Sequence, residues 1–211
     1  MKFSDSVLYL DNHLLIVNKP AGLLTQPTDC SSDSLEERAK AYIKERFEKP
    51  GAVYLHAVHR LDRPVSGIVL FARTSKALSR LQEQQRNREI QKVYFALVDQ
   101  EPKKKSGELK HKLLHGSHKA EVCERGKEAI LRYKVVGKNL LRIELVTGRY
   151  HQIRAQLAAI GSPIVGDKKY GSHMSCPEGQ IALHHGEMVF VHPTTKKEIN
   201  ISKQPKFQTT A

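Results

Sequence analysis

Apolar residues fall into short runs along the chain, separated by polar breaks. The runs at 7–10 and 14–17 flank Asp11-Asn12, a dipeptide that favours a turn, so two short strands are expected there. Later runs are continuous and short, which is typical of strands buried on both faces. These further strands are predicted over 67–73, 93–98, 187–193 and, with more polar edges, at several places within 108–146.

Helical periodicity is confined to fewer segments. A helix is predicted over 34–47, where Ser34 and Glu37 fit a capping box, and another is expected after Thr74. A third is expected over 150–161. Because strands often follow one another without a helix between them, the pattern predicts an α+β fold. We expect a mixed, largely antiparallel central sheet with flanking helices.

Composition places the chain among globular proteins. It has 211 residues, 39% of them apolar and 27% charged, with no internal repeat or low-complexity linker. A single domain over 1–201 is therefore expected. Residues 202–211 have little to bury, and we expect them to fray.

Membrane and secreted classes are disfavoured. No apolar run approaches the roughly 18 residues of a membrane span, and Asp5 and Asp11 interrupt any secretory signal. Cys30, Cys123 and Cys176 are far apart and show no metal-binding or disulfide spacing. We expect a cytoplasmic protein without a membrane partner, and a monomer, since no segment is evidently suited to self-association.

The charge balance points to an acidic partner. Lys and Arg number 35 against 22 Asp and Glu, a formal charge of +13. Basic residues concentrate in 73–92 and 101–128, a pattern that favours a surface following nucleic-acid phosphates. A solvated helix face or loop would also explain either stretch alone. Aromatic residues make up 6% of the chain and Trp is absent, which disfavours a base-stacking platform.

The densest polar constellation is HAVHRLDRPVSG at 56–67, directly before an apolar strand. Asp62 lies between Arg60 and Arg63, whose charges would keep its carboxylate ionised and available as a nucleophile or base. A structural turn, in which Asp62 accepts backbone N–H bonds, is the alternative.

A second constellation, TGRYHQIR at 147–154, joins a strand to the third helix. Arg149 and Arg154 lie near the start of that helix, a place suited to an anion or a carboxylate. Arg154 follows the apolar Ile153, so it is expected to be partly buried and to need a partner. A surface arginine pair at a helix cap is the alternative.

Together with three other blocks, these motifs resemble a known family. The five blocks occur in the order VNKPAGL (17–23), HRLDRPVSG (59–67), QKVYFALV (91–98), TGRYHQIR (147–154) and GSPIVGDKKYG (161–171). In this order they resemble the RluA-type family of RNA pseudouridine synthases, from about residue 7 to residue 193.

The resemblance implies a role for individual residues. Asp62 matches the catalytic aspartate, and Tyr94 matches the tyrosine whose ring packs against the target base. Arg154 matches the arginine that pairs with the aspartate, and Arg60 the arginine that enters the RNA stack where the base leaves it. The same blocks supply the other predicted substrate contacts, which are Lys19, His59, Arg149, Gln152 and Ile153.

The resemblance also implies a reaction without cofactor or metal, carried out by a stand-alone catalytic domain lacking an S4 domain. The expected substrate is a uridine in structured RNA, ribosomal RNA or transfer RNA or both, which must be flipped out of its stack. Asp62 could attack the sugar, attack the base or remove a sugar proton; the sequence leaves these open. Departures from the family pattern at Val65, 155–156, Ser162 and 184–185 leave the choice of RNA open.

Two other functions are also consistent with parts of the sequence. His56, His59 and Asp62 are spaced by three residues, and His184-His185 could complete the metal site of a nucleic-acid hydrolase. Alternatively, the chain could be an RNA-binding module of the same fold without activity.

Overall fold

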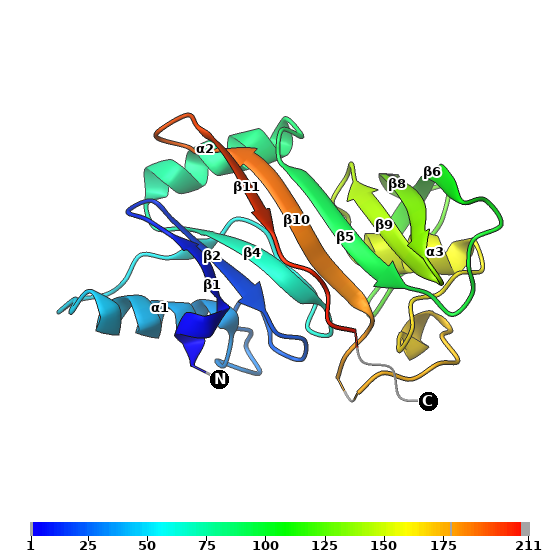
Figure 1. Ribbon diagram of the computed structural model, residues 1–211, viewed down its shortest axis with the longest axis horizontal. Helices are drawn as coiled ribbons and strands as arrows, with labels where there is room; N and C mark the ends of the chain where they lie inside the picture. Colours follow the sequence, from blue (N-terminus) through cyan, green and yellow to red (C-terminus); the bar gives the residue numbers. More distant parts are fainter. Residues whose placement is uncertain (1, 178, 208–211) are drawn as a thin grey trace. The chain divides into compact units, whose positions relative to one another are not determined.

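The computed structural model describes residues 2–177 and 179–207 (Figure 1). These residues divide into two compact units, and the single domain over 1–201 stays a prediction. The first unit comprises the chain up to Ile90 and Met188–Lys203. The second comprises Gln91–Glu187 and the residues from Gln204 onward.

The first unit is built on antiparallel strands. β1 (Val7–Leu10) pairs with β2 (Leu14–Lys19), which pairs with β4 (Ser66–Ala72). The short β3 (His56–Ala57) also pairs with β4, and a 3-10 helix, η1 (Phe3–Ser6), precedes β1. The turn between β1 and β2 is the predicted one: Asp11 Oδ1 accepts the N–H groups of His13 and Leu14 at 2.8 and 2.7 Å.

Two helices of this unit begin at the predicted caps. Ser34 accepts the Glu37 N–H at the start of α1 (Leu35–Arg46). Thr74 accepts the Ala77 N–H at the start of α2 (Ser75–Arg86). Each cap satisfies an N–H group that has no partner within the helix, which is why these helices start where they do.

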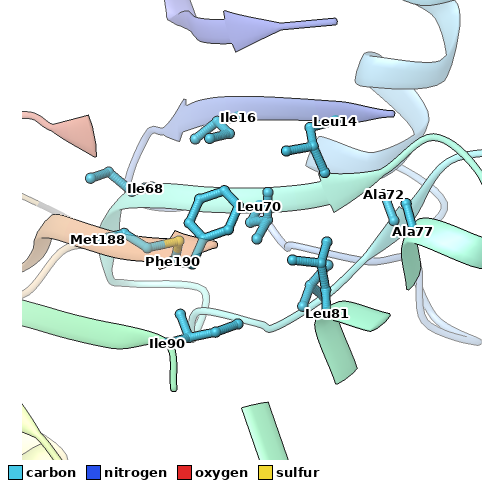
Figure 2. Packing of buried hydrophobic residues seen from close by; sticks show 11 residues of the cluster. Leu14, Ile16, Ile68, Leu70, Ala72, Ala77, Leu81, Ile90, Met188 and Phe190 are labelled. Carbon is cyan, nitrogen blue, oxygen red and sulfur yellow. The ribbon is translucent and has the colours of Figure 1, made fainter. Parts of the chain in front are cut away.

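The core of the first unit gathers apolar side chains from strands and α2 (Figure 2). Ile16 and Leu70 come from the paired β2 and β4, and Leu81 from α2. Met188 and Phe190 join them from the end of β10 (Leu183–Val191). The chain therefore returns to this core after about a hundred residues in the second unit.

The second unit is built on antiparallel strands followed by a helix. Its strands run β5 (Gln91–Leu97), β9 (Leu140–Leu145), β8 (Lys127–Gly137), β6 (Ser106–His115) and β7 (Ala120–Val122) in spatial order. The helix α3 (Gln152–Ala159) and the 3-10 helix η2 (Lys168–Tyr170) follow. Ala155 of α3 packs with Leu113, Ala120 and Ala129 of the strands, and Tyr170 covers this cluster.

Strand β10 contributes residues to both units and extends further than predicted. It starts at Leu183, whereas the sequence indicated a strand over 187–193, because His184, His185 and Gly186 interrupt the apolar run. The described strands form one mixed sheet of 11 in the order β1-β2-β4-β10-β5-β9-β8-β6-β7, with β3 on β4 and β11 (Glu198–Ser202) on β10. The predicted α+β fold class is confirmed.

The last strand ends close to the predicted boundary of the tail. β11 reaches Ser202, residues 203–207 adopt no regular structure, and the rest of the predicted frayed tail lies outside the described residues. No helix in the described part of the chain has the length and apolar character needed to cross a membrane.

Candidate active site

Asp62 lies in the loop between β3 and β4 of the first unit. Its carbonyl accepts the Val65 N–H at 3.0 Å, which closes a turn at the entrance to β4. The residue is half-buried, while Arg60 and Arg63 on either side are exposed. The loop therefore presents a carboxylate flanked by two cations, as the sequence predicted.

Thr25 forms hydrogen bonds with both backbone groups of Leu61, the residue before Asp62. Its Oγ1 accepts the Leu61 N–H at 3.1 Å and donates to the Leu61 carbonyl at 2.9 Å. Thr25 and Leu61 are both buried, so both backbone groups of Leu61 are satisfied without water. The position of Asp62 is thus set by a contact between residues 36 apart in the chain.

Lys19, whose role as a substrate contact stays a prediction, is fully buried at the end of β2, with 0% of its surface exposed. Its Nζ donates to the carbonyls of Pro20, Leu23 and Arg63 at 3.0, 2.7 and 3.2 Å. Burial lowers the pKa of Lys19 to about 7, and the charge of Asp62 opposes that shift. Lys19 therefore ties two loops together and places a cation within electrostatic reach of Asp62.

His59 is also held by the protein itself. Its Nε2 accepts the Leu70 N–H at 3.2 Å, which anchors the HRLD segment to β4. Among residues 2–177 and 179–207, no group of three or more His, Cys, Asp or Glu side chains is arranged to hold a metal ion. The rival metal site drawn from His56, His59, Asp62 and His184-His185 thus has no ligand cluster in the described structure.

Tyr94 lies in the middle of β5 in the second unit and is 6% exposed. Its ring stacks on that of His185 with centroids 4.5 Å apart and planes 15° apart. His185 comes from the part of β10 that the sequence did not predict as a strand. The stacking fixes the plane of the Tyr94 ring.

Arg154 is 5% exposed on α3, and its charge partner within the second unit is Asp167. Nε and Nη2 donate to the two carboxylate oxygens at 2.7 and 2.9 Å, a bidentate pair. The sequence predicted that Arg154 is partly buried and needs a partner; the side chain is buried more deeply than that, and Asp167 is one partner. Asp167 follows Gly166, which has a φ of +84° and where a Cβ would lie 2.8 Å from Cys176 Cβ, so glycine is required there.

His151 links Arg154 to a hairpin. Arg154 Nη1 donates to His151 Nε2 at 2.7 Å, so Nε2 carries no proton, and Nδ1 must donate to the Tyr170 hydroxyl at 2.9 Å. That hydroxyl also accepts the Ala120 N–H at 2.7 Å and donates to the Ala120 carbonyl. Burial raises the pKa of Tyr170 to about 12, so its hydroxyl keeps its proton.

The remaining predicted contacts divide into buried and exposed residues. Gln152 is buried: its Oε1 accepts from Thr147 Oγ1 and the Arg149 N–H, and its Nε2 donates to the Ile130 carbonyl. Ile153 is also buried. Arg149 is exposed, with Nε donating to the Glu128 carbonyl at 2.9 Å. Gln152 and Ile153 therefore hold the TGRYHQIR loop, whereas Arg149 faces solvent.

Four framework residues were not assigned a role from sequence: Thr25, His151, Asp167 and Tyr170. Asp167 and Tyr170 both fall within the block GSPIVGDKKYG, which was the available signal. A buried arginine without a nearby acid in its own segment also implied a carboxylate from elsewhere. Thr25 had no comparable signal, because its bonds depend on how two distant loops meet.

A sequence model of the family described as RNA pseudouridylate synthase matches residues 13–159, more than half of the chain. The chain is a member of the RNA pseudouridylate synthase family. The match includes Asp62, Tyr94 and Arg154, whereas Asp167 and Tyr170 lie beyond its end. Members of this family are isomerases that make pseudouridine in RNA.

Curated relatives of this pseudouridine synthase cover nearly all of it. It is 33% identical over 211 residues to the dual-specificity RNA pseudouridine synthase RluA of Pasteurella multocida, covering 95% of this chain and 93% of that protein. It is 34% identical to the ribosomal large subunit pseudouridine synthase C of Escherichia coli, covering 94% of this chain and 66% of that protein.

A solved structure agrees with the fold. Human RNA pseudouridylate synthase domain containing 4 superposes with a TM-score of 0.80 at 21% identity, covering 96% of this chain and 89% of that one. At this identity the likeness concerns the fold alone.

Proposed function

We propose that this synthase converts uridine to pseudouridine in structured RNA, with Asp62 as the catalytic carboxylate. The observation that carries the proposal is the setting of Asp62. It is a half-buried acid on a loop fixed by Thr25 and Lys19, between two exposed arginines, within the segment that matches the family. Preorganised placement of a reacting group is a large part of what an enzyme contributes.

The reaction needs one carboxylate and no redox chemistry. The N1–C1′ bond breaks, the uracil rotates, and a C5–C1′ bond forms. C5 then loses its hydrogen to solvent, and N1 gains a proton. A carboxylate can stabilise or capture the electron-poor C1′, as carboxylates do in glycosidases. Water must stay out, because it would hydrolyse the separated sugar.

Other residues are assigned supporting roles in this proposal. The Tyr94 ring packs against the target base, and Arg60 fills the stack after the uridine is flipped. Arg154 is a catalytic residue whose pairing with Asp62 stays a prediction of the resemblance; its bonds to Asp167 hold the guanidinium in place. Arg149, which is exposed, is a phosphate contact.

The substrate class follows the names of the relatives. One relative is called dual-specificity and another acts on the ribosomal large subunit. We propose ribosomal RNA, transfer RNA or both as substrates of this chain. The net charge of +13 suits the phosphate backbone of either.

The test is tritium release from ribosomal and transfer RNA transcripts labelled at C5 of uridine. Wild-type protein should release tritium without added cofactor. Asp62→Asn should bind the same RNA and release tritium at least roughly 10⁴-fold more slowly, because the change removes the reacting group and little volume. Tyr9→Phe serves as a control substitution in the first unit.

Two outcomes would overturn the proposal. Wild-type protein that binds RNA without releasing tritium would be a binding module of this fold. Asp62→Asn protein that keeps the wild-type rate would remove Asp62 from the chemistry.

A further inference from the structure

A row of four aromatic rings runs across the second unit. His115 and Tyr150 have ring centroids 4.2 Å apart. Tyr150 stacks on His151 at 3.9 Å with planes 18° apart, and His151 meets Tyr170 edge-on at 5.6 Å. The row joins the end of β6, the TGRYHQIR loop and η2, three segments that are distant in sequence.

The two ends of the row differ in exposure. His151 is buried and fixed by hydrogen bonds to Arg154 and Tyr170. Tyr150 is 37% exposed, and His115 is also exposed. An exposed ring is ordinarily mobile, but His151 covers one face of Tyr150 and holds its plane. The outer end is therefore a pre-oriented aromatic surface open to solvent.

The segments that carry these rings are cationic. Residues 109–120, 147–154 and 168–174 contain no Asp or Glu, and their basic residues are Lys110, Lys112, Lys119, Arg149, Arg154, Lys168 and Lys169. Carboxylates just outside these segments offset part of this charge: Lys110 pairs with Glu108, Lys112 with Glu124, Lys119 with Glu121, and the buried Arg154 with Asp167. Arg149 and Lys169 donate to backbone carbonyls and keep their full charge.

A fixed exposed ring among cations fits a nucleotide with an unstacked base. The exposed pair of rings, His115 and Tyr150, offers an apolar surface to the base, and the cations offer contacts to the flanking phosphates. We infer that Tyr150 and His115 form a stacking site for an unpaired base of the substrate RNA. The inference rests on the proposed function. It places the stacked base beside His151, the residue that bonds Arg154.

This site changes the expectation drawn from composition. A low aromatic content argued against a stacking platform, but two tyrosines, Tyr150 and Tyr170, lie in one row with two histidine rings. One such ring is sufficient for a single base, whereas a platform for a long strand needs several.

The absence of Trp from the sequence gives a direct test. Tyr150→Trp introduces a single indole at the outer end of the row. Adding single-stranded oligouridylate should quench its fluorescence, because a base stacks on it. An RNA duplex with the same number of phosphates should quench it far less. Phe47→Trp is the matched control, since Phe47 is 44% exposed but its ring is covered by Arg73 at 4.7 Å.

Binding measurements separate stacking from charge. Tyr150→Ala should bind the oligouridylate about 5- to 100-fold more weakly, whereas Tyr150→Phe should bind like wild type. The dependence of log K on log salt should keep its slope in both, because no phosphate contact is lost. Equal quenching by duplex and single strand, or unchanged binding by Tyr150→Ala, would overturn the stacking site.

Tritium release by the wild-type protein distinguishes failure of the stacking site from failure of the proposed function. Release by wild type, together with unquenched indole fluorescence in the Tyr150→Trp protein, would remove the stacking site and leave the proposed function standing. Quenching without any release would remove the proposed function and keep an RNA-stacking surface.

Discussion

Lys19 in the first unit and Arg154 in the second are both buried cations, 0% and 5% exposed, but they are satisfied differently. Lys19 donates to three backbone carbonyls and has a carboxylate, Asp62, only within electrostatic reach. Arg154 has a buried carboxylate of its own, Asp167, in a bidentate pair. Carbonyl dipoles compensate burial only partly, and the Lys19 pKa falls, while a full counter-charge keeps the arginine ionised.

The two units therefore hold their buried cations by different means. In the first unit the acid is half-buried on a fixed loop, and the lysine within electrostatic reach of it is held by backbone carbonyls. In the second unit the cation is fixed by a network that ends on a hairpin backbone. Mutations at Lys19 and at the Arg154–Asp167 pair should therefore differ in how they change stability, its pH dependence and the rate of tritium release.

The largest effect on stability is expected from Asp167→Asn. It removes the charge of the buried carboxylate that forms a bidentate pair with Arg154, which should reduce the free energy of unfolding by about 3–5 kcal/mol. Urea denaturation followed by circular dichroism measures the change. Tritium release should fall with it, since the guanidinium loses two of its anchors.

The chain contains a matched control for this experiment. Asp33 pairs with Arg38 in the same bidentate geometry, at 2.8 and 2.8 Å, but on the surface. Asp33→Asn should leave the urea midpoint unchanged, because solvent screens the pair. Equal losses in the two variants would show that burial is not what distinguishes them.

A pH-dependent effect is expected from Lys19→Met. Folded Lys19 loses its proton near pH 7, whereas the unfolded chain keeps it to about pH 10.4. The unfolded state thus binds more protons between these values, and wild-type stability should rise with pH relative to Lys19→Met. The free energy of unfolding of wild type, relative to Lys19→Met, should have increased by about 3 kcal/mol at pH 9.5.

Urea titrations at pH 6, 8 and 9.5 measure this difference. Lys40→Met is the control, since two glutamates raise the pKa of Lys40 and no gain over this range is expected. In the Asp62→Asn protein the rise of stability with pH should start at lower pH, because the charge that stabilises protonated Lys19 is gone. Parallel curves for wild type and Lys19→Met would mean that Lys19 titrates normally.

A smaller effect is expected from Tyr170→Phe. The change removes the hydroxyl that bonds His151 and both backbone groups of Ala120, at a cost of about 1–3 kcal/mol. Tritium release should fall several-fold, and the ratio to wild type should not change with pH, since the wild-type hydroxyl stays protonated up to about pH 12. Tyr133→Phe, which loses a single 3.3 Å bond, is the comparison. Similar losses in both would mean that the bond to His151 does not position Arg154.

Local features of the chain were predictable from sequence. The strands at β1, β2, β4 and β5 follow from continuous apolar runs, and the starts of α1 and α2 follow from Ser34 and Thr74. β11 and the first half of β10 were missed, because the alternating EINIS and the His-His-Gly step look like loop sequence. Their pairing is decided by neighbouring strands rather than by their own composition.

The sequence predicted which residue types form the site better than it predicted where their side chains lie. The resemblance identified Asp62, Tyr94 and Arg154 as candidates, and the apolar neighbour of Arg154 indicated its burial. Lys19 ends an apolar run, so the pattern was equally consistent with an outward side chain. Its burial depends on the Arg63 carbonyl, 44 residues away, and such contacts leave no local signal.

The burial of Lys19 also makes it a chemical reporter. Amine-reactive esters acylate the neutral form of lysine, and a pKa of about 7 would make Lys19 more reactive than an ordinary lysine if a reagent could reach it. With 0% of its surface exposed, it reacts only when the loops around it open. The acylation rate of Lys19, read by mass spectrometry, therefore measures how often the segment bearing Asp62 comes apart. RNA bound to that segment should slow it.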